Sequence, residues 1–318
     1  MQIADTVIWC DAQRKQQLCF ISHAEIPLTW RDGAHAKVVT THQTIRLAEA
    51  VQASIPTEVL LTPLGRPFAL GRLRLELLAS GMAPGAAQLW VELPQRRVIY
   101  AAGGINPRGG RTVAAAQLRS CDAIALDPLT ASHMQALPKV AEVEAALIDA
   151  VRVAQAAERA ILILTRPLGP AGELASLFSS QAIFVRAHRK ISAYLAAYPT
   201  PLPLPLPRGA PPPGAVVLWP VGLPLPGWFS RANMRLFVVG PEAAMAAYLD
   251  KHNPDAAFPL AMQADLEELA TFAVQSGARE VYLTSALQPQ ASVRVQAAFA
   301  ERGLRVYELN RPSQMVLL

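Results

Sequence analysis

The stretch Leu18-Cys19-Phe20-Ile21-Ser22-His23-Ala24-Glu25-Ile26-Pro27 decides how the rest of this sequence is interpreted. Its first four residues are apolar and typical of a buried strand, and the run ends in the pair Ser22-His23. The residues that follow, Ala24 to Pro27, contain no second histidine. The stretch is therefore a predicted strand that ends in a lone histidine, and the segments elsewhere in the chain decide how that histidine is interpreted.

The composition is that of a globular protein with a large core. Of 318 residues, 52% are hydrophobic and 17% are charged, which suits one large domain or two rather than a disordered chain. No apolar run reaches the roughly 18–20 residues that span a bilayer, and the chain starts without a basic segment followed by an apolar one. Cys10, Cys19 and Cys121 are scattered, which favours reduced, buried thiols. We therefore expect a cytoplasmic protein without a membrane segment.

The charge of the chain permits contact with nucleic acid but does not require it. The formal net charge is +5 and the isoelectric point is about 9.3. Most of the excess is arginine, spread along the chain rather than gathered in a tail. The charge alone is therefore a weak indication of the partner.

The hydrophobic pattern changes near the middle of the chain. Residues 1–130 contain short apolar segments of strand type and one predicted helix, 44–54, which starts in the Thr41/Thr44 region. From residue 139 onward, segments of helix type and strand type alternate, which predicts a parallel sheet with crossover helices. The proline-rich segment 199–213 is predicted to be an extended polyproline-II loop, either a stiff spacer or a docking site for an aromatic groove.

Further segments follow in an order that carries more weight than any one of them. Residues 9–12 read Trp-Cys-Asp-Ala, residues 62–71 read Thr-Pro-Leu-Gly-Arg-Pro-Phe-Ala-Leu-Gly, and residues 79–88 read Ala-Ser-Gly-Met-Ala-Pro-Gly-Ala-Ala-Gln. Residues 99–104 read Ile-Tyr-Ala-Ala-Gly-Gly, residues 258–265 read Phe-Pro-Leu-Ala-Met-Gln-Ala-Asp, and residues 277–286 read Gly-Ala-Arg-Glu-Val-Tyr-Leu-Thr-Ser-Ala. In this order, over nearly its whole length, the chain resembles the β-CASP branch of the metallo-β-lactamase superfamily. It is similar to exonuclease-like proteins akin to mRNA 3′-end processing factors and to DNA-ligase-associated exonucleases.

The resemblance implies that most of the family's metal ligands have been replaced here. In the family's first metal loop, His-x-His-x-Asp-His, only His23 remains, because Glu25 takes the place of the second histidine and Pro27 that of the aspartate. The positions that match the family's metal and acidic motifs are Asp11, His23, Glu25, Met82, Asp127, Gln263, Asp265 and Ser285, together with Gly103 or Gly104, depending on the alignment gap.

The same resemblance implies the architecture and the cofactors. It implies a metallo-β-lactamase-like αββα sandwich with an inserted β-CASP-like α/β domain. The expected bounds are 1–130 for the first part of the sandwich, 131–257 for the inserted domain with its loop 199–213, and 258–318 for the return segment. The family uses two Zn or Mn ions, for which Met, Gly, Gln and Ser are poor ligands. We therefore expect no metal or other cofactor, and the residual alternative is one weakly held ion at His23, Glu25 and Asp127.

The function that fits these observations is that of a pseudonuclease. Such a protein would bind nucleic acid, a protein partner in a nucleic-acid processing complex, or both, by analogy with inactive members that accompany active nucleases. The cleft between the family's two domains admits single-stranded nucleic acid, and Trp219, Trp228 and Phe229 are candidate stacking faces. The side chains expected to contact single-stranded DNA or RNA are Arg108, Arg111, Arg189, Arg231 and Arg235.

Two alternatives stay open at this point. One is a divergent metal-dependent exonuclease that uses His23, Glu25 and Asp127 in an altered geometry. The other is a structural scaffold that binds no nucleic acid. The sequence contains no nucleophile elbow, phosphate-binding loop, dinucleotide fingerprint or zinc-knuckle spacing, so no motif indicates a different active site.

Overall fold

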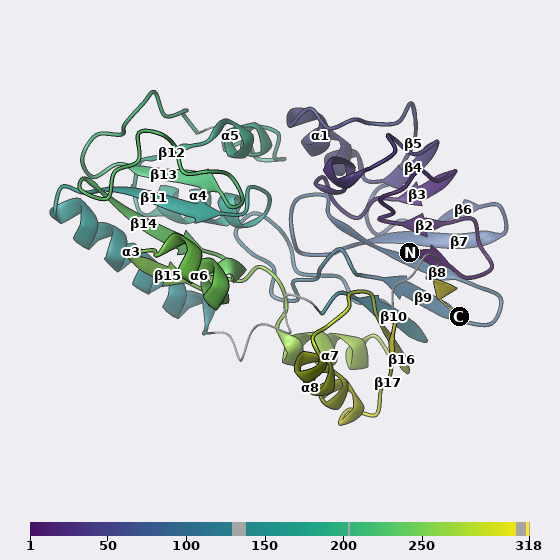
Figure 1. The fold of residues 1–318 in the computed structure, drawn as a ribbon. Helices are drawn as coiled ribbons and strands as arrows, with labels where there is room; N and C mark the ends of the chain where they lie inside the picture. Colours follow the sequence, from purple (N-terminus) through teal and green to yellow (C-terminus); the bar gives the residue numbers. More distant parts are fainter. Residues whose placement is uncertain (129–137, 203, 310–315, 318) are drawn as a thin grey trace. The chain divides into compact units, whose positions relative to one another are not determined.

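The computed structural model describes residues 1–128, 138–202, 204–309 and 316–317 (Figure 1). The chain divides into two compact units, one formed by Met1–Ala136 with Gln263–Leu318 and the other by Leu137–Met262. Both units combine helices with sheets, so the predicted α/β class is confirmed. The domain boundary expected at 130/131 lies outside the described residues. None of the described helices is long and apolar enough to cross a membrane.

The first unit contains two sheets. The six-stranded sheet has the order β18-β1-β2-β3-β4-β5. Its strands are β1 (Gln2–Ile3), β2 (Trp9–Cys10), β3 (Leu18–Phe20), β4 (Lys37–Thr40), β5 (Glu58–Leu61) and β18 (Val316–Leu317). The seven-stranded sheet has the order β17-β16-β10-β9-β8-β7-β6. Its strands are β6 (Phe68–Leu70), β7 (Leu73–Ala79), β8 (Ala87–Glu92), β9 (Arg97–Tyr100), β10 (Ala123–Leu126), β16 (Glu280–Leu283) and β17 (Arg305–Glu308).

The alternation of side chains along the seven-stranded sheet sets the layers of this unit. Leu75 and Leu77 point to one face and share a core with Ile8 and Phe20 of the six-stranded sheet and its loops. Leu78 points to the other face, against the helices α7 (Leu266–Gln275) and α8 (Pro289–Ala300). The two sheets therefore pack on each other, and helices cover the outer face of the larger one (Figure 1).

The helix α1 (His42–Ala50) lies beside strands β3–β5 (Figure 1). It begins two residues before the predicted 44–54 because the Thr41 hydroxyl accepts a hydrogen bond from the backbone N–H of Thr44 and so caps the helix. It also ends earlier than predicted, and Gln52 directly after it adopts a left-handed φ of 59°. Caps and backbone turns, which hydrophobic periodicity does not register, therefore explain both differences.

The second unit is built on one parallel sheet with the order β12-β13-β11-β14-β15, as the alternating pattern predicted. Its strands are β11 (Ala160–Thr165), β12 (Val185–Ala187), β13 (Val216–Pro220), β14 (Met234–Val239) and β15 (Ala256–Phe258). Its helices are α3 (Val140–Ala156), α4 (Pro170–Ser180), α5 (Arg189–Ala196) and α6 (Ala246–His252). The connection from β13 to β14, residues 221–233, contains no helix.

The proline-rich segment 199–213, apart from residue 203, lies against the edge strand β12 and helix α5. The backbone N–H of Ala187 donates to the carbonyl oxygen of Pro205 at 3.0 Å, and the Ser192 hydroxyl donates to that of Leu204 at 2.7 Å. The unpaired backbone groups of an edge strand can pair with a strand of another chain. A proline-rich segment beside such an edge has few backbone N–H groups, so it does not extend the sheet itself. Residues 204 and 205 therefore cover part of the sheet edge, and the stiff spacer and the docking site both stay predictions for the segment.

The three cysteines are buried and form no disulfide bond. Burial raises the pKa of the Cys19 thiol to about 12 and that of Cys121 to about 11, and it raises the pKa of Cys10 well above its usual range. Because only the thiolate attacks electrophiles, we expect the native protein to react with no thiol reagent at pH 8 within minutes. In the denatured protein, Ellman's reagent should detect three reactive thiols per chain. A fast-reacting native thiol would contradict this burial.

Candidate functional site

Ser22, two residues after the end of β3, is the centre of a buried hydrogen-bond network. Its backbone N–H donates to Asp11 Oδ1 at 2.8 Å, and its hydroxyl donates to Asp11 Oδ2 at 2.6 Å. Tyr100 donates to the same Oδ2 atom at 3.1 Å, and burial, with the nearby Asp11, raises the pKa of this phenol well above its usual range. Asp11 thus fixes the end of β3 from a position with a left-handed φ of 46°.

The direction of these hydrogen bonds decides what Ser22 and His23 can do. Ser22 Oγ lies 2.8 Å from His23 Nδ1. Because the serine proton is directed at Asp11, which accepts only, His23 Nδ1 must carry a proton and donate to Ser22 Oγ. A nucleophilic serine needs the opposite arrangement, with the imidazole accepting its proton. Ser22 is also only 2% exposed, so this trio positions the loop and does not activate a nucleophile.

Two glycines close the space beside this network. A Cβ atom on Gly103 would lie 2.3 Å from Ser22 Oγ and 3.5 Å from His23 Nδ1. A Cβ atom on Gly104 would lie 3.1 Å from Gln263 Nε2 and 3.4 Å from Met82 Cε, and Gly104 has a φ of +97° that disfavours any side chain. Gly103 therefore has no room for the bridging aspartate that the family resemblance places at this pair, and the backbone of Gly104 disfavours one.

The structure brings together several positions that the resemblance assigned to metal ligands. His23 lies beside Gly103, while Met82 and Gln263 lie around Gly104. Met82 is half-buried, and Gln263 Oε1 is buried without a hydrogen-bond partner among the described residues. The side chains around this glycine pair therefore offer one imidazole, one thioether and one amide.

Asp127, Ser285 and Glu25 occupy separate turns around this region. Asp127 and Ser285 come after neighbouring parallel strands, since Leu126 on β10 pairs with Leu283 on β16. The Leu126 carbonyl oxygen accepts hydrogen bonds from both the backbone N–H and the hydroxyl of Thr284. Glu25 precedes the short 3₁₀ helix η1 (Ile26–Thr29), and its carbonyl oxygen accepts the N–H of Leu28.

This donor set does not fit a pair of divalent cations. Two-metal sites need several imidazoles and a carboxylate that bridges the ions, while thioethers and amides bind Zn²⁺ and Mn²⁺ poorly. Among the residues that the structure describes, no three His, Cys, Asp or Glu side chains are grouped so that they could hold a metal ion. The residual set His23, Glu25 and Asp127 is therefore not assembled as a ligand group.

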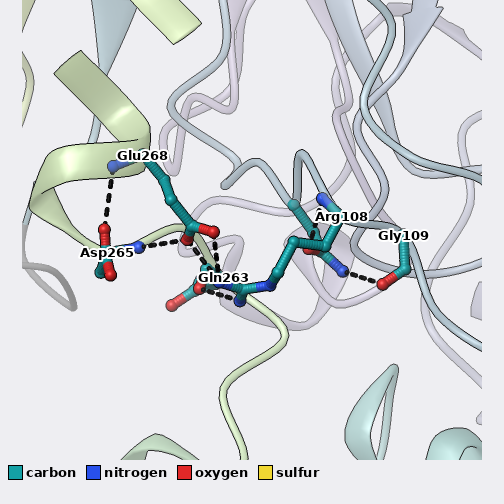
Figure 2. Close-up of polar contacts among 6 residues, drawn as sticks. Arg108, Gly109, Gln263, Asp265 and Glu268 are labelled. Carbon is teal, nitrogen blue, oxygen red and sulfur yellow. Dashed lines mark hydrogen bonds and ion pairs between the residues drawn. The ribbon is translucent and has the colours of Figure 1, made fainter. Parts of the chain in front are cut away.

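Asp265 serves as a helix cap, a role that the sequence comparison missed (Figure 2). Its Oδ1 accepts the backbone N–H of Glu268 at 2.8 Å, and Glu268 Oε2 accepts the N–H of Asp265 at 3.0 Å, which is a capping box at the start of α7. The Asp-x-x-Glu spacing before an apolar run is the signal that identifies this role from sequence.

Arg108 completes the same cluster (Figure 2). Its Nη1 lies 2.5 Å from both carboxylate oxygens of Glu268, and its Nη2 donates to the carbonyl oxygen of Gln263 at 3.2 Å. The charge of Arg108 is thus matched by Glu268, and the pair ties the loop after β9 to the start of α7. The guanidinium of Arg108 is held within the unit by this pair, and its contact to nucleic acid stays a prediction.

The other predicted nucleic-acid contacts differ in their surroundings. Arg111 and Arg189 are exposed. Arg235 Nη1 lies 3.0 Å from Asp255 Oδ1, and Arg231 Nη1 lies 3.9 Å from Asp255 Oδ2. Arg231 and Arg235 therefore share one carboxylate and keep a net positive charge between them.

Comparison with known proteins gives a fold likeness and no family. No protein-family model matches the chain, and no curated protein matches it. A crystal structure of a protein of unknown function from Enterococcus faecalis V583 is similar, with a TM-score of 0.58 and 13% sequence identity. The similarity covers 86% of this chain and 76% of the other. At this identity the likeness concerns the fold alone.

Proposed function

We propose that this chain is a catalytically inactive member of the β-CASP type of metallo-β-lactamase-fold proteins, and that it acts by binding single-stranded nucleic acid. Two packed sheets with helices outside, interrupted by a parallel α/β unit, support the architecture that the sequence resemblance implies. The fold alone does not assign an activity, so the chemistry of the site carries the argument.

The observation that carries the loss of catalysis is the close packing of Gly103 on Ser22. A carboxylate that bridges two cations has to project from this place, but even a methyl group on Gly103 would lie 2.3 Å from Ser22 Oγ. The neighbouring ligand positions hold Met82 and Gln263, which support packing and hydrogen bonding rather than hydroxide generation. The metal loop persists as a structural element, held by Asp11 through Ser22.

Binding of nucleic acid is supported by charge and by exposed arginines. The net charge of +5 attracts polyanions, and Arg111 and Arg189 are exposed. Cationic contacts to phosphates release counterions, so affinity should fall as salt rises.

One experiment separates this proposal from its two rivals. The purified chain is incubated with labelled single-stranded DNA and RNA 20-mers and Mn²⁺ or Zn²⁺, beside a His23→Ala variant. The same oligonucleotides are used in a shift assay between 20 and 200 mM salt. We expect no cleavage above the level of the variant, and binding that weakens with salt. Cleavage that His23→Ala abolishes would establish an enzyme instead, and failure to bind at 20 mM salt would leave a scaffold.

A further inference from the structure

We propose that an aromatic row on the second unit, formed by His188, Trp219, Trp228 and Phe229, is the surface on which single-stranded nucleic acid stacks. This inference rests on the proposed function and gives it a location. Ring contacts join three of its members, because His188 and Trp219 have centroids 4.6 Å apart and Trp219 and Trp228 have centroids 5.9 Å apart. Phe229 follows Trp228 directly in the sequence.

One crossover of the parallel sheet lacks a helix, and it supplies Trp228 and Phe229 to the row. The connection 221–233 between β13 and β14 covers the sheet face with side chains that pack on Leu162, Val217 and Leu236. Trp219, Trp228 and Phe229 are half-buried, with one part against this core and the rest at the surface. Chain segments of this kind give rigid aromatic faces, which lose little entropy when a base stacks on them.

Cations flank the row at both ends. Arg189 and Lys190 follow His188 at the start of α5, and neither forms an ion pair with another described residue. Cations at a helix N-terminus oppose the helix dipole, and this first turn contains no acidic residue, so helix stability does not explain them. At the other end, the guanidinium of Arg231, which shares Asp255 with Arg235, lies 5.9 Å from the centre of the Phe229 ring.

Two hydrogen-bonding groups of the row are already used within the unit, which leaves the ring faces as its main contact surface. Trp219 Nε1 donates to the carbonyl oxygen of Pro224 at 3.0 Å, and His188 Nδ1 accepts the backbone N–H of Lys190 at 3.2 Å. Burial, with the neighbouring Arg189 and Lys190, lowers the pKa of His188, so that this ring is neutral at pH 7. The row therefore offers mainly ring faces, and the cations offer phosphate contacts. Single-stranded DNA and RNA suit this chemistry, while a duplex keeps its bases inside.

The test uses variants of the full chain that separate stacking from packing. Trp228→Leu keeps an apolar side chain and removes the ring, while Trp228→Phe keeps a ring. Phe184→Leu is the matched control, because Phe184 is an aromatic residue of the same unit that is 65% exposed and lies outside the row. Affinities for labelled dT15, rU15 and a 15-bp duplex are measured by fluorescence anisotropy at 50 mM salt, with thermal melts to verify folding.

We expect Trp228→Leu to weaken binding of both single strands by about tenfold, with Trp228→Phe and Phe184→Leu close to the wild type. The double variant Arg189→Gln/Lys190→Gln should weaken binding and reduce the slope of log K against log salt concentration by about 1.4, which corresponds to two phosphate contacts. The control Arg152→Gln, on α3, should change the affinity and this slope much less. If the wild type binds and Trp228→Leu binds equally well, the row is not the platform although the proposed function stands. If the wild type binds neither single strand, the proposed function itself fails.

Discussion

Replacing Gly103 with alanine should lower the free energy of unfolding by about 3 kcal/mol. The added methyl group would lie 2.3 Å from Ser22 Oγ and 2.6 Å from Ser22 Cβ, inside normal contact distance. Ser22 cannot move aside cheaply, because it is 2% exposed and its N–H and hydroxyl are both held by Asp11. Urea denaturation monitored by tryptophan fluorescence measures the change.

Gly227 is the matched control for this substitution. A Cβ atom there would have no neighbour within 4 Å, so Gly227→Ala should be neutral or slightly stabilising through the unfolded state. Combining Gly103→Ala with Ser22→Gly removes the atoms that clash, so the double variant should be more stable than the sum of the two single changes predicts. If Gly103→Ala is as stable as Gly227→Ala, the site has room for a side chain and the argument for a closed metal position is wrong.

Hydrophobic periodicity was enough to predict the α/β class and the parallel sheet of the second unit. In that sheet β11 is apolar throughout, as a strand buried on both faces requires, and it alternates with amphipathic helices. Element ends were less predictable, since α1 is bounded by the Thr41 cap and by the turn at Gln52. The helix-free crossover 221–233 likewise follows from aromatic packing on the sheet, which has no periodic signature.

The candidate site could be predicted only as a set of positions. The resemblance pointed to His23, Met82 and Gln263, and the structure places these side chains around Gly103-Gly104. It gave no indication that the Ser22 hydroxyl links Asp11 to His23, because the network depends on tertiary contacts, among them one from Tyr100, 89 residues from Asp11 in the sequence. The direction of the hydrogen bond between Ser22 and His23 decides whether the serine is a positioning group or a nucleophile. Residue identities alone do not give this direction.

Asp265 and Arg108 have a local role that the sequence reasoning did not predict. They were singled out as a position of a metal motif and as a possible phosphate contact. In the structure Asp265 caps α7, and Arg108 pairs with the Glu268 of the same capping box. A charged residue near a helix start should therefore be tested as a cap before it is assigned to a site.

The second large effect is expected from Arg119→Ala, which should lower the free energy of unfolding by about 3 kcal/mol. Glu76 on β7 has a side chain that is only 4% exposed, and its Oε2 lies 3.1 Å from Arg119 Nη2. Glu76 Oε2 forms no hydrogen bond with a described residue, so its contact with Arg119 is mainly Coulombic. Among the described residues, Arg119 is the cation that pairs with Glu76. Arg119 also lies 5.2 Å from the ring centre of Trp90, the residue paired with Glu76 across β7 and β8.

The cost should come from a buried carboxylate left without its cation, and a second variant isolates that cause. Adding Glu76→Gln to Arg119→Ala removes the charge and should restore part of the lost stability, because a neutral amide is less costly to bury. Arg74→Ala is the control on the same strand, since Arg74 and Glu92 are 59% and 43% exposed and an exposed pair contributes about 0.5 kcal/mol or less. Equal losses in Arg119→Ala and Arg74→Ala would show that Glu76 is hydrated in solution, and the unpaired charge would then carry no large penalty.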